Sequence, residues 1–217
     1  MDPRHRQLAE IALQAAGDKY GLALAGGYAV RAHGMGDRPS GDVDLFTDWQ
    51  RRADFPAVAD LVIQAMIDNG FVVDVDTRAE TFARLLVTPS DEPDSEPQKV
   101  ELAADWRAHT PVTLSIGPVL HPDDAVGNKM GALYGRTVAR DFLDVDAALA
   151  GGRYSGERLI QLAEAADPGF DRAMFADALG ALDQISDAAF TPYGAGPSDI
   201  QRMRERFAAW RAELKQG

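Results

Sequence analysis

Asp42 and Asp44 flank a single valine, a spacing that places both carboxylates on one face of a β-strand. Val43 then points to the opposite face, into the core. Two carboxylates on one strand face supply the hard oxygen ligands that Mg²⁺ prefers. The spacing alone is weak evidence, because Asp74 and Asp76 repeat it on another predicted strand. The residues that precede each pair must therefore distinguish them.

Gly26 and Gly27 stand upstream of the first pair, where a short apolar strand predicted over 22–25 ends. Glycine lets the backbone approach a phosphate closely, and the N–H groups that open the following helix attract negative charge. A phosphate-binding turn beside a divalent-metal site is the combination that nucleotide transfer requires. We therefore expect Asp42 and Asp44 to be functional, and the second pair to be surface residues.

Gly26-Gly27, followed after fourteen residues by Asp42-Val43-Asp44, resembles the signature of the DNA polymerase β-type nucleotidyltransferase superfamily. The fuller sequence, Leu-Ala-Gly-Gly-Tyr-Ala-Val and then Arg-Pro-Ser-Gly-Asp-Val-Asp-Leu-Phe, is more similar to its AbiEii/MenT branch. Many members of that branch are toxins of toxin–antitoxin pairs. The resemblance implies transfer of a nucleoside monophosphate from an NTP, such as ATP or CTP, with release of pyrophosphate. It also implies two Mg²⁺ ions, with Mn²⁺ as the alternative, held by three carboxylates.

The third carboxylate is expected on a later strand, predicted over 99–103, and Glu101 fits this place. Val100 and Leu102 face the core, so Glu101 faces the other side. The resemblance implies that this residue both binds metal and activates the acceptor hydroxyl as a general base. The alternatives are Asp105 first, and then Asp74 or Asp76.

Further residues are expected to bind the nucleotide. Lys129 lies on a predicted helix, where a lysine can reach phosphates as a mobile point charge. An acid such as Asp141, near the start of the next helix, is ordinarily a helix stabiliser. The resemblance instead matches Lys129 and Asp141 to catalytic positions of the family. It also places Ser40, Arg136 and Arg140 at the nucleotide.

The pattern along the chain predicts an α+β fold, with a nucleotidyltransferase-type mixed β-sheet flanked by helices and a C-terminal helical bundle. Residues 1–121 are expected to form the catalytic core, and residues 122–217 the helical region that completes the active-site cleft. In the first region, helices are predicted over 4–16 (ended by Gly17), 27–33 and 55–69, with strands over 22–25, 43–47, 71–76, 82–88, 99–103 and within 112–120. In the second, helices are predicted over 123–134, 142–150, 155–166, 171–182 and 198–215.

The formal charge of −12 and a pI near 4.7 disfavour broad, non-specific binding of nucleic acid. A local basic patch is still possible, although nearby acids can offset each candidate. The candidates are Arg51-Arg52, Arg136 with Arg140, and the series Arg202, Arg204, Arg206, Arg211 and Lys215.

Trp106, Trp210 and Phe207 are expected in the core or an interface. The chain has no cysteine, no apolar run long enough to span a membrane, and no signal peptide, so we expect a cytoplasmic protein.

The acceptor is the open question. The toxin branch suggests the 3′ end of tRNA, together with a cognate antitoxin as partner. The negative net charge favours a cationic small molecule, as in aminoglycoside nucleotidyltransferases, and a protein side chain is a further alternative. A third hypothesis is that the chain binds nucleotide without catalysing a reaction. A protein of that kind would not need to retain Asp42, Asp44, Glu101 and Lys129 together.

Overall fold

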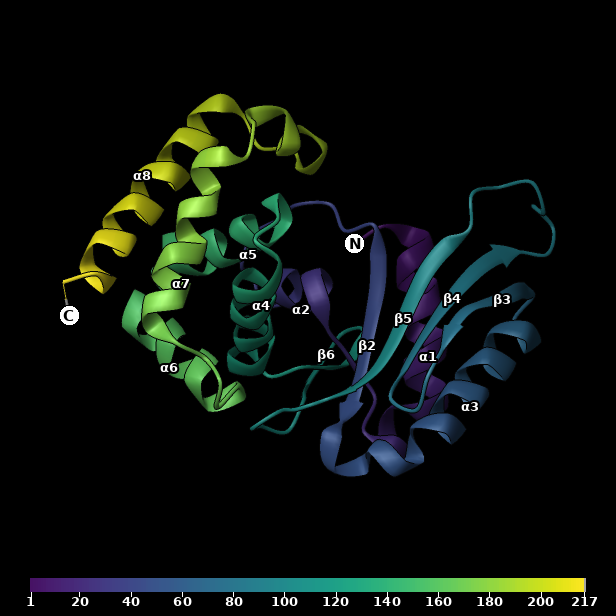
Figure 1. Cartoon of the computed structure of the whole chain (residues 1–217). Coiled ribbons are helices and arrows are strands. Elements are labelled where there is room, and N and C mark those ends of the chain that lie inside the picture. The colour runs from purple at the N-terminus through teal and green to yellow at the C-terminus, as the bar shows by residue number, and fades with distance from the viewer. Residues whose placement is uncertain (217) are drawn as a thin grey trace. The chain divides into compact units, whose positions relative to one another are not determined.

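The computed structural model of the chain describes residues 1–216. The chain divides into two compact units (Figure 1). The sheet unit comprises Met1–Ala32 and Ser40–His121, and the helical unit comprises His33–Pro39 and Pro122–Gly217. The segment 33–39, expected in the N-terminal region, thus packs with the C-terminal helices. The α+β fold predicted from the sequence is confirmed.

The sheet unit is built on seven strands in the order β3-β4-β5-β2-β1-β7-β6. Their bounds are β1 Ala23–Leu24, β2 Asp42–Asp48, β3 Phe71–Arg78, β4 Phe82–Pro89, β5 Gln98–Asp105, β6 Val112–Leu114 and β7 Gly117–Val119. β2 runs parallel to β5 and antiparallel to β1. Alternate residues of the central strands, such as Val43, Leu45 and Leu102, are fully buried, as the period of two predicts.

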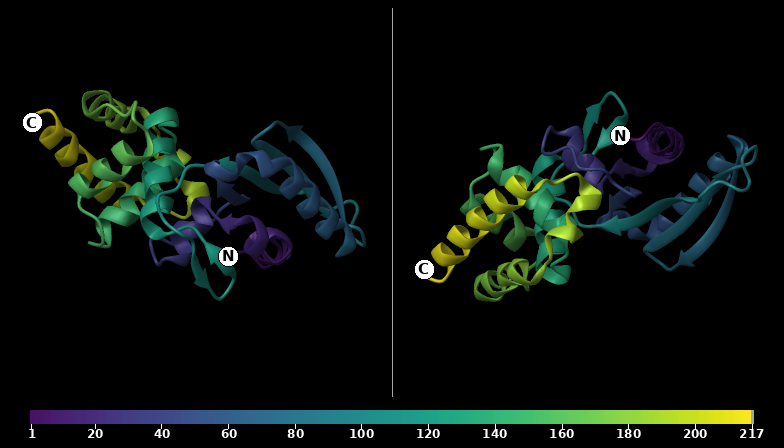
Figure 2. Two further views of the ribbon diagram at one scale, coloured as in Figure 1. Left: turned by 90° about the horizontal axis from the view of Figure 1, so that it is seen from below. Right: turned by 90° about the horizontal axis from the view of Figure 1, so that it is seen from above.

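Two helices, α1 (Pro3–Tyr20) and α3 (Phe55–Asp68), pack side by side on the face of the sheet that carries these buried residues (Figure 2). The short helix α2 (Gly26–Ala32) follows β1, and a 3-10 helix, η1 (Trp49–Asp54), joins β2 to α3. The buried core therefore lies between α1, α3 and one face of the sheet. The opposite face of β2 and β5 remains for polar side chains.

The end predicted for the first helix is wrong. α1 continues through Gly17, which is buried because β7 passes so close that a Cβ there would lie 3.4 Å from the ring of Pro118. The helix ends instead at Gly21, whose left-handed φ of +67° forms the cap. The two glycines serve different purposes, close packing and helix termination, which their spacing in the sequence does not distinguish.

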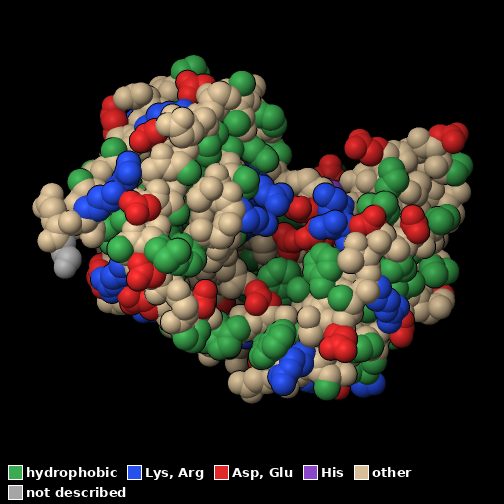
Figure 3. Space-filling view, viewed as in Figure 1, with side chains coloured by type: hydrophobic (Ala, Val, Ile, Leu, Met, Phe, Trp, Pro, Cys, Tyr) green, Lys and Arg blue, Asp and Glu red, His purple; other side chains and the backbone are tan. Residues whose placement is uncertain are grey.

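The helical unit contains α4 (Pro122–Arg136), α5 (Ala139–Ala150), α6 (Gly156–Ala166), α7 (Arg172–Leu179) and α8 (Pro197–Leu214), with 3-10 turns η2 (Gly180–Gln184), η3 (Asp187–Ala189) and η4 (Thr191–Tyr193) between the last two helices. The helix expected over 171–182 ends at Leu179 and tightens into η2. Aromatic rings fill the core: Phe207 makes an edge-on contact with Phe142, and Trp210 makes one with Phe175. Basic and acidic side chains alternate on the surface of these helices (Figure 3).

The segment 33–39 is fixed to α5 and to the turn that follows this helix by a few specific contacts. Met35 is buried, and a Cβ at Gly36 would lie 2.9 Å from that of Ala147 on α5. Arg153 donates a hydrogen bond to the carbonyl of His33, and Arg38 forms an ion pair with Asp144 on α5. The loop that leads to the Asp42 strand is therefore anchored by its own side chains.

None of the helices in the described part of the chain is long and apolar enough to cross a membrane.

Candidate active site

The turn between β1 and α2 brings Gly26 against the side chain of Asp44. β1 pairs antiparallel with β2, and the N–H of Ala25 donates to the carbonyl of Asp44 at 2.8 Å. Gly26 then adopts a left-handed φ of +59°, and a Cβ at this position would overlap the Asp44 carboxylate. Only glycine combines this φ with the space that the carboxylate occupies. The Gly-Gly turn and the acid pair thus form one local structure.

Three carboxylates converge on the face of the sheet that lies opposite α1 and α3. Asp44 on β2 and Glu101 on β5 are direct neighbours across the parallel pair, and Asp42 precedes Asp44 by two residues on the same face. One carboxylate oxygen from each lies within 4.8 Å of the other two. This set of hard oxygen ligands fits Mg²⁺ or Mn²⁺. The structure brings together the three predicted metal ligands, and their role in catalysis stays a prediction.

Glu101 has a basic neighbour that the sequence reasoning missed. Arg84 on β4 is its partner in the antiparallel register, and the guanidinium Nε donates to Glu101 Oε1 at 2.9 Å. This hydrogen bond is the main reason why the pKa of Arg84 is raised. The guanidinium also lies 3.6 Å from Asp76, so it joins two carboxylates on the sheet surface.

The alternative third carboxylates lie elsewhere. Asp105 faces Asp48 four residues further along the β2–β5 pair, and burial raises its pKa. Asp74 and Asp76 are exposed on β3, at the edge of the sheet. Among the described residues, Glu101 is the acid that groups with the first aspartate pair.

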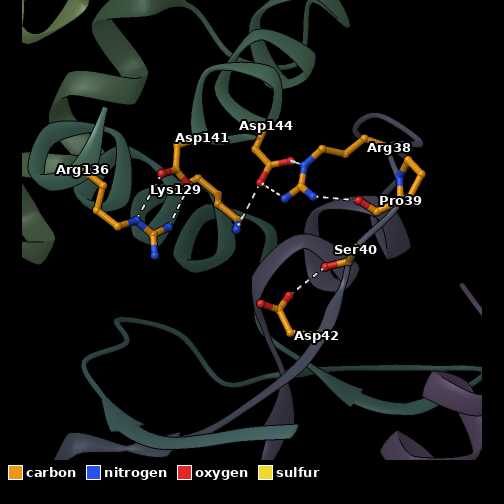
Figure 4. Close-up of polar contacts among 8 residues, drawn as sticks. All are labelled: Arg38, Pro39, Ser40, Asp42, Lys129, Arg136, Asp141 and Asp144. Carbon is orange, nitrogen blue, oxygen red and sulfur yellow. Dashed lines mark hydrogen bonds and ion pairs between the residues drawn. The ribbon is translucent and has the colours of Figure 1, made fainter. Parts of the chain in front are cut away.

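Ser40 lies beside the acids, where its hydroxyl donates to Asp42 Oδ1 at 3.1 Å (Figure 4). Its carbonyl accepts a hydrogen bond from the hydroxyl of Tyr28 on α2, at 3.3 Å. That hydroxyl lies 2.7 Å from His5 Nδ1, in a buried contact, and burial raises the pKa of Tyr28. The residue predicted to bind the triphosphate is therefore held from two sides by the sheet unit.

Lys129 lies on α4 with its ammonium group largely buried in the helical unit. Its Nζ is 3.1 Å from Asp144 on α5, and only 10% of the lysine side chain is exposed. Arg38 donates two hydrogen bonds to the same carboxylate, each 2.6 Å long (Figure 4). Asp144 is 4% exposed and balances two cations. Lys129 is thus held by a carboxylate that is itself fixed by the 33–39 segment.

Asp141, one turn before Asp144 on α5, has a different partner. It is fully buried and accepts two hydrogen bonds from Arg136, at 2.8 and 3.1 Å (Figure 4). Arg136 is the last residue of α4, and its side chain is 48% exposed. Arg140 is partly exposed on the first turn of α5. Asp141 therefore contacts Arg136, which was predicted to bind nucleotide. Lys129 contacts Asp144 instead.

The contact of Lys129 with Asp144 was missed, although the sequence holds a signal for it. Asp141 and Asp144 are three residues apart on one helix, so both point to the same side. Nothing in the local sequence shows which of the two meets Lys129, because that depends on how α4 packs on α5. Arg38 precedes the acid strand in the sequence, and its contact with Asp144 spans 106 residues, so local patterns could not reveal it.

The chain combines a mixed sheet flanked by helices with a left-handed glycine turn and a cluster of three carboxylates. The sequence model described as "Nucleotidyl transferase AbiEii toxin, Type IV TA system" matches residues 6–216. The chain therefore belongs to the AbiEii nucleotidyltransferase toxin family, which confirms the resemblance drawn from the sequence, and the protein is a nucleotidyltransferase. None of the curated proteins matches it.

Solved structures share the fold at low sequence identity. JHP933 from Helicobacter pylori has a TM-score of 0.63 and 15% identity, over 98% of this chain and 93% of that one. A second H. pylori structure, titled a putative nucleotidyltransferase, has a TM-score of 0.63 and 16% identity, over 98% and 96% of the two chains. MenT4, a nucleotidyltransferase toxin from Mycobacterium tuberculosis H37Rv, has a TM-score of 0.57 and 17% identity, over 98% and 86%.

Proposed function

We propose that this nucleotidyltransferase transfers a nucleoside monophosphate from an NTP to the 3′ end of tRNA, with Asp42, Asp44 and Glu101 as its metal ligands. One observation carries the proposal: three carboxylate oxygens from β2 and β5 lie within 4.8 Å of one another, beside the Gly26 turn. Divalent ions bound there would neutralise charge on the phosphates and activate the acceptor hydroxyl.

The residues of the chain itself have distinct roles in this proposal. The α2 turn at Gly26 and Gly27 offers N–H groups to the phosphates, and Ser40 orients Asp42 through its hydrogen bond. Lys129 neutralises the triphosphate, and Asp144 positions its ammonium group. Catalysis then rests on orientation and charge stabilisation rather than on a covalent intermediate.

Both units contribute to the proposed reaction. The carboxylates belong to the sheet unit, whereas Lys129, Arg136 and Asp141 belong to the helical unit. We propose that the helical region completes the NTP site, as the division at residue 121 predicts. Addition of a nucleotide to tRNA would block its aminoacylation and stop translation, which accounts for toxicity and for a cognate antitoxin in the cytoplasm.

A cationic small molecule is the second candidate acceptor. The net charge of −12 favours it, because an acidic protein attracts cations and repels RNA. The same chemistry would serve both acceptors. The acceptor therefore has to be found by experiment.

The test is transfer from an α-labelled NTP in the presence of Mg²⁺, with total tRNA in one reaction and aminoglycosides in another. We expect label on tRNA, and its loss by at least about a hundredfold in Asp44→Asn, as for other groups that stabilise charge in a transition state. Asp74→Asn is the matched control, because Asp74 belongs to the second aspartate pair and is exposed on the edge strand β3, and this variant should retain activity. Full activity in Asp44→Asn would contradict the assignment of the site, and label on the aminoglycoside alone would contradict the tRNA acceptor.

A further inference from the structure

Aromatic and basic side chains gather where β2 and β5 end in the sheet unit, away from the acids. Trp49 directly follows β2, and Trp106 directly follows the paired strand β5. Both indoles are exposed, at 44% and 37%. Of the two places predicted for Trp106, the core is therefore wrong and an interface stays a prediction. Neighbouring exposed apolar side chains on a protein surface mark an interaction site more often than a single one does.

Cations lie directly on the aromatic rings of this region. The guanidinium carbon of Arg52 lies 5.0 Å from the ring centre of Trp49. Lys19 and Arg51 lie 4.8 and 5.7 Å from the ring centre of Tyr20, at the end of α1. Arg51 also donates to the carbonyl of Lys19 at 2.9 Å, which ties η1 to α1. Such cation–π contacts hold the side chains in fixed positions.

Arg107 brings the second tryptophan to the same place. Its guanidinium donates to the carbonyl of Gly21 at 2.9 Å and lies 3.5 Å from Asp48. The chain around Trp106 is therefore fixed beside the end of α1 and the end of β2. We name this region the Trp49 surface; its members are Lys19, Tyr20, Trp49, Arg51, Arg52 and Trp106. Basic and hydrophobic side chains lie next to each other at the lower edge of this unit in Figure 3.

The cations of the Trp49 surface differ from those of α8. On α8 each candidate of the basic series has an acidic partner: Arg202 with Asp199, Arg204 with Asp187, Arg206 with Asp146, Arg211 with Asp183, and Lys215 with Asp177. Arg51 likewise pairs with Asp54. The side chain of Lys19 contacts the ring of Tyr20, and that of Arg52 contacts the ring and the backbone carbonyl of Trp49. Within the described residues, neither cation has a carboxylate within ion-pair distance. Their charge is available to a ligand.

We infer that the Trp49 surface binds a single-stranded part of the acceptor RNA, with bases stacked on the indoles and phosphates held by Lys19 and Arg52. Aromatic rings interleaved with cations are the usual means of binding single strands without reading their sequence. The inference rests on the proposed RNA acceptor. Because β2 separates Asp42 from Trp49 by about 20 Å at the rise of a strand, the surface would hold nucleotides distant from the reacting end.

The test measures RNA binding by fluorescence anisotropy, without NTP or Mg²⁺, in the full-length Asp44→Asn protein. The probe is a labelled oligouridylate of about 12 nucleotides, a length within the footprint of common single-strand-binding folds. We expect Trp49→Ala to weaken binding at least about fivefold, the lower limit for loss of one stacked base, and Trp49→Phe to retain most of it. Arg52→Glu should also weaken binding and reduce the slope of affinity against salt by about one.

The charge-matched control is Arg78→Glu, an exposed arginine that pairs with Asp60 in the same unit, and it should bind as the parent does. Wild-type affinity in Trp49→Ala and Arg52→Glu would overturn the inference, as would equal losses in Arg78→Glu. If the variants bound RNA normally but failed to bind the antitoxin, the surface would be a protein interface and the inference would be wrong. If the enzyme transferred label to tRNA but these variants did not change RNA binding, only the inference would be contradicted. If the Trp49 surface bound RNA but no transfer to tRNA occurred, only the proposed function would be contradicted.

Discussion

The carboxylate of Asp44 occupies the space that any side chain at residue 26 would need. Gly26 also has a φ of +59°, so alanine there would suffer both backbone strain and overlap. We expect Gly26→Ala to lower the free energy of unfolding by more than the roughly 1–2 kcal/mol of a left-handed alanine, and to abolish transfer by displacing Asp44. Gly70→Ala is the control, since its φ is +84° but nothing lies within 4 Å of a Cβ. Urea unfolding and transfer assays measure both effects, and equal behaviour of the two variants would contradict the role of the carboxylate.

The acids Asp141 and Asp144 should differ in their effect on stability. Removal of the Asp144 charge leaves two largely buried cations, Arg38 and Lys129, without their carboxylate. We expect Asp144→Asn to lower the free energy of unfolding by about 3 kcal/mol and to raise KM for the NTP. Asp141→Asn removes the charge only from the pair with Arg136, whose side chain is half exposed to water, and should cost less. A larger loss in Asp141→Asn, measured by urea unfolding, would contradict this order.

Arg84 should set the metal requirement of the enzyme. Its guanidinium hydrogen-bonds to Glu101, one of the predicted metal ligands, and its charge opposes a divalent ion. We expect Arg84→Gln to lower the Mg²⁺ concentration at half-maximal transfer severalfold, and Glu101→Gln to raise it. Removal of the metal with EDTA should stop the reaction in both. An increased metal requirement in Arg84→Gln would show instead that the arginine holds Glu101 in position.

Asp105 should make the protein less stable as its carboxyl group ionises. Burial raises its pKa, so the folded protein holds this proton more tightly than the unfolded chain does. Stability therefore falls as pH rises from the unfolded pKa, near 3.9, through the folded one. Asp105→Asn should raise the melting temperature relative to the wild type at about pH 7, with little difference near pH 3. Its amide oxygen can keep the hydrogen bond from the N–H of Trp106. A variant that melts below the wild type at neutral pH would contradict this.

Much of the fold follows from local signals in the sequence. The alternation of apolar residues predicts the strands 43–47, 82–88 and 99–103, and the helical period predicts the major helices, because each burial pattern repeats within a single element. Asp42, Asp44 and Glu101 are brought together by the parallel pairing of β2 and β5, as their alternation suggests. These predictions required only the face of the strand on which each side chain lies and the identity of the neighbouring strand.

Other features depend on contacts between distant parts of the chain. Arg38 meets Asp144 across 106 residues of the sequence, and Gly17 on α1 packs directly against Pro118 on β7. Trp106 is exposed because β5 ends one residue earlier, at a point that hydrophobicity cannot mark. Residue type gives the chemistry of such side chains, but packing selects the partner.

The second aspartate pair, on β3, lies on a strand that is open along one edge. Val72 and Val75 are exposed there at 57% and 39%, and an apolar edge of this kind invites pairing with a strand of another molecule. Asp74 and Asp76 put negative charges on the same strand, and two such edges repel each other. We therefore expect the Asp-x-Asp repeat that resembles the predicted metal-binding pair to oppose edge-to-edge pairing between two copies of the chain.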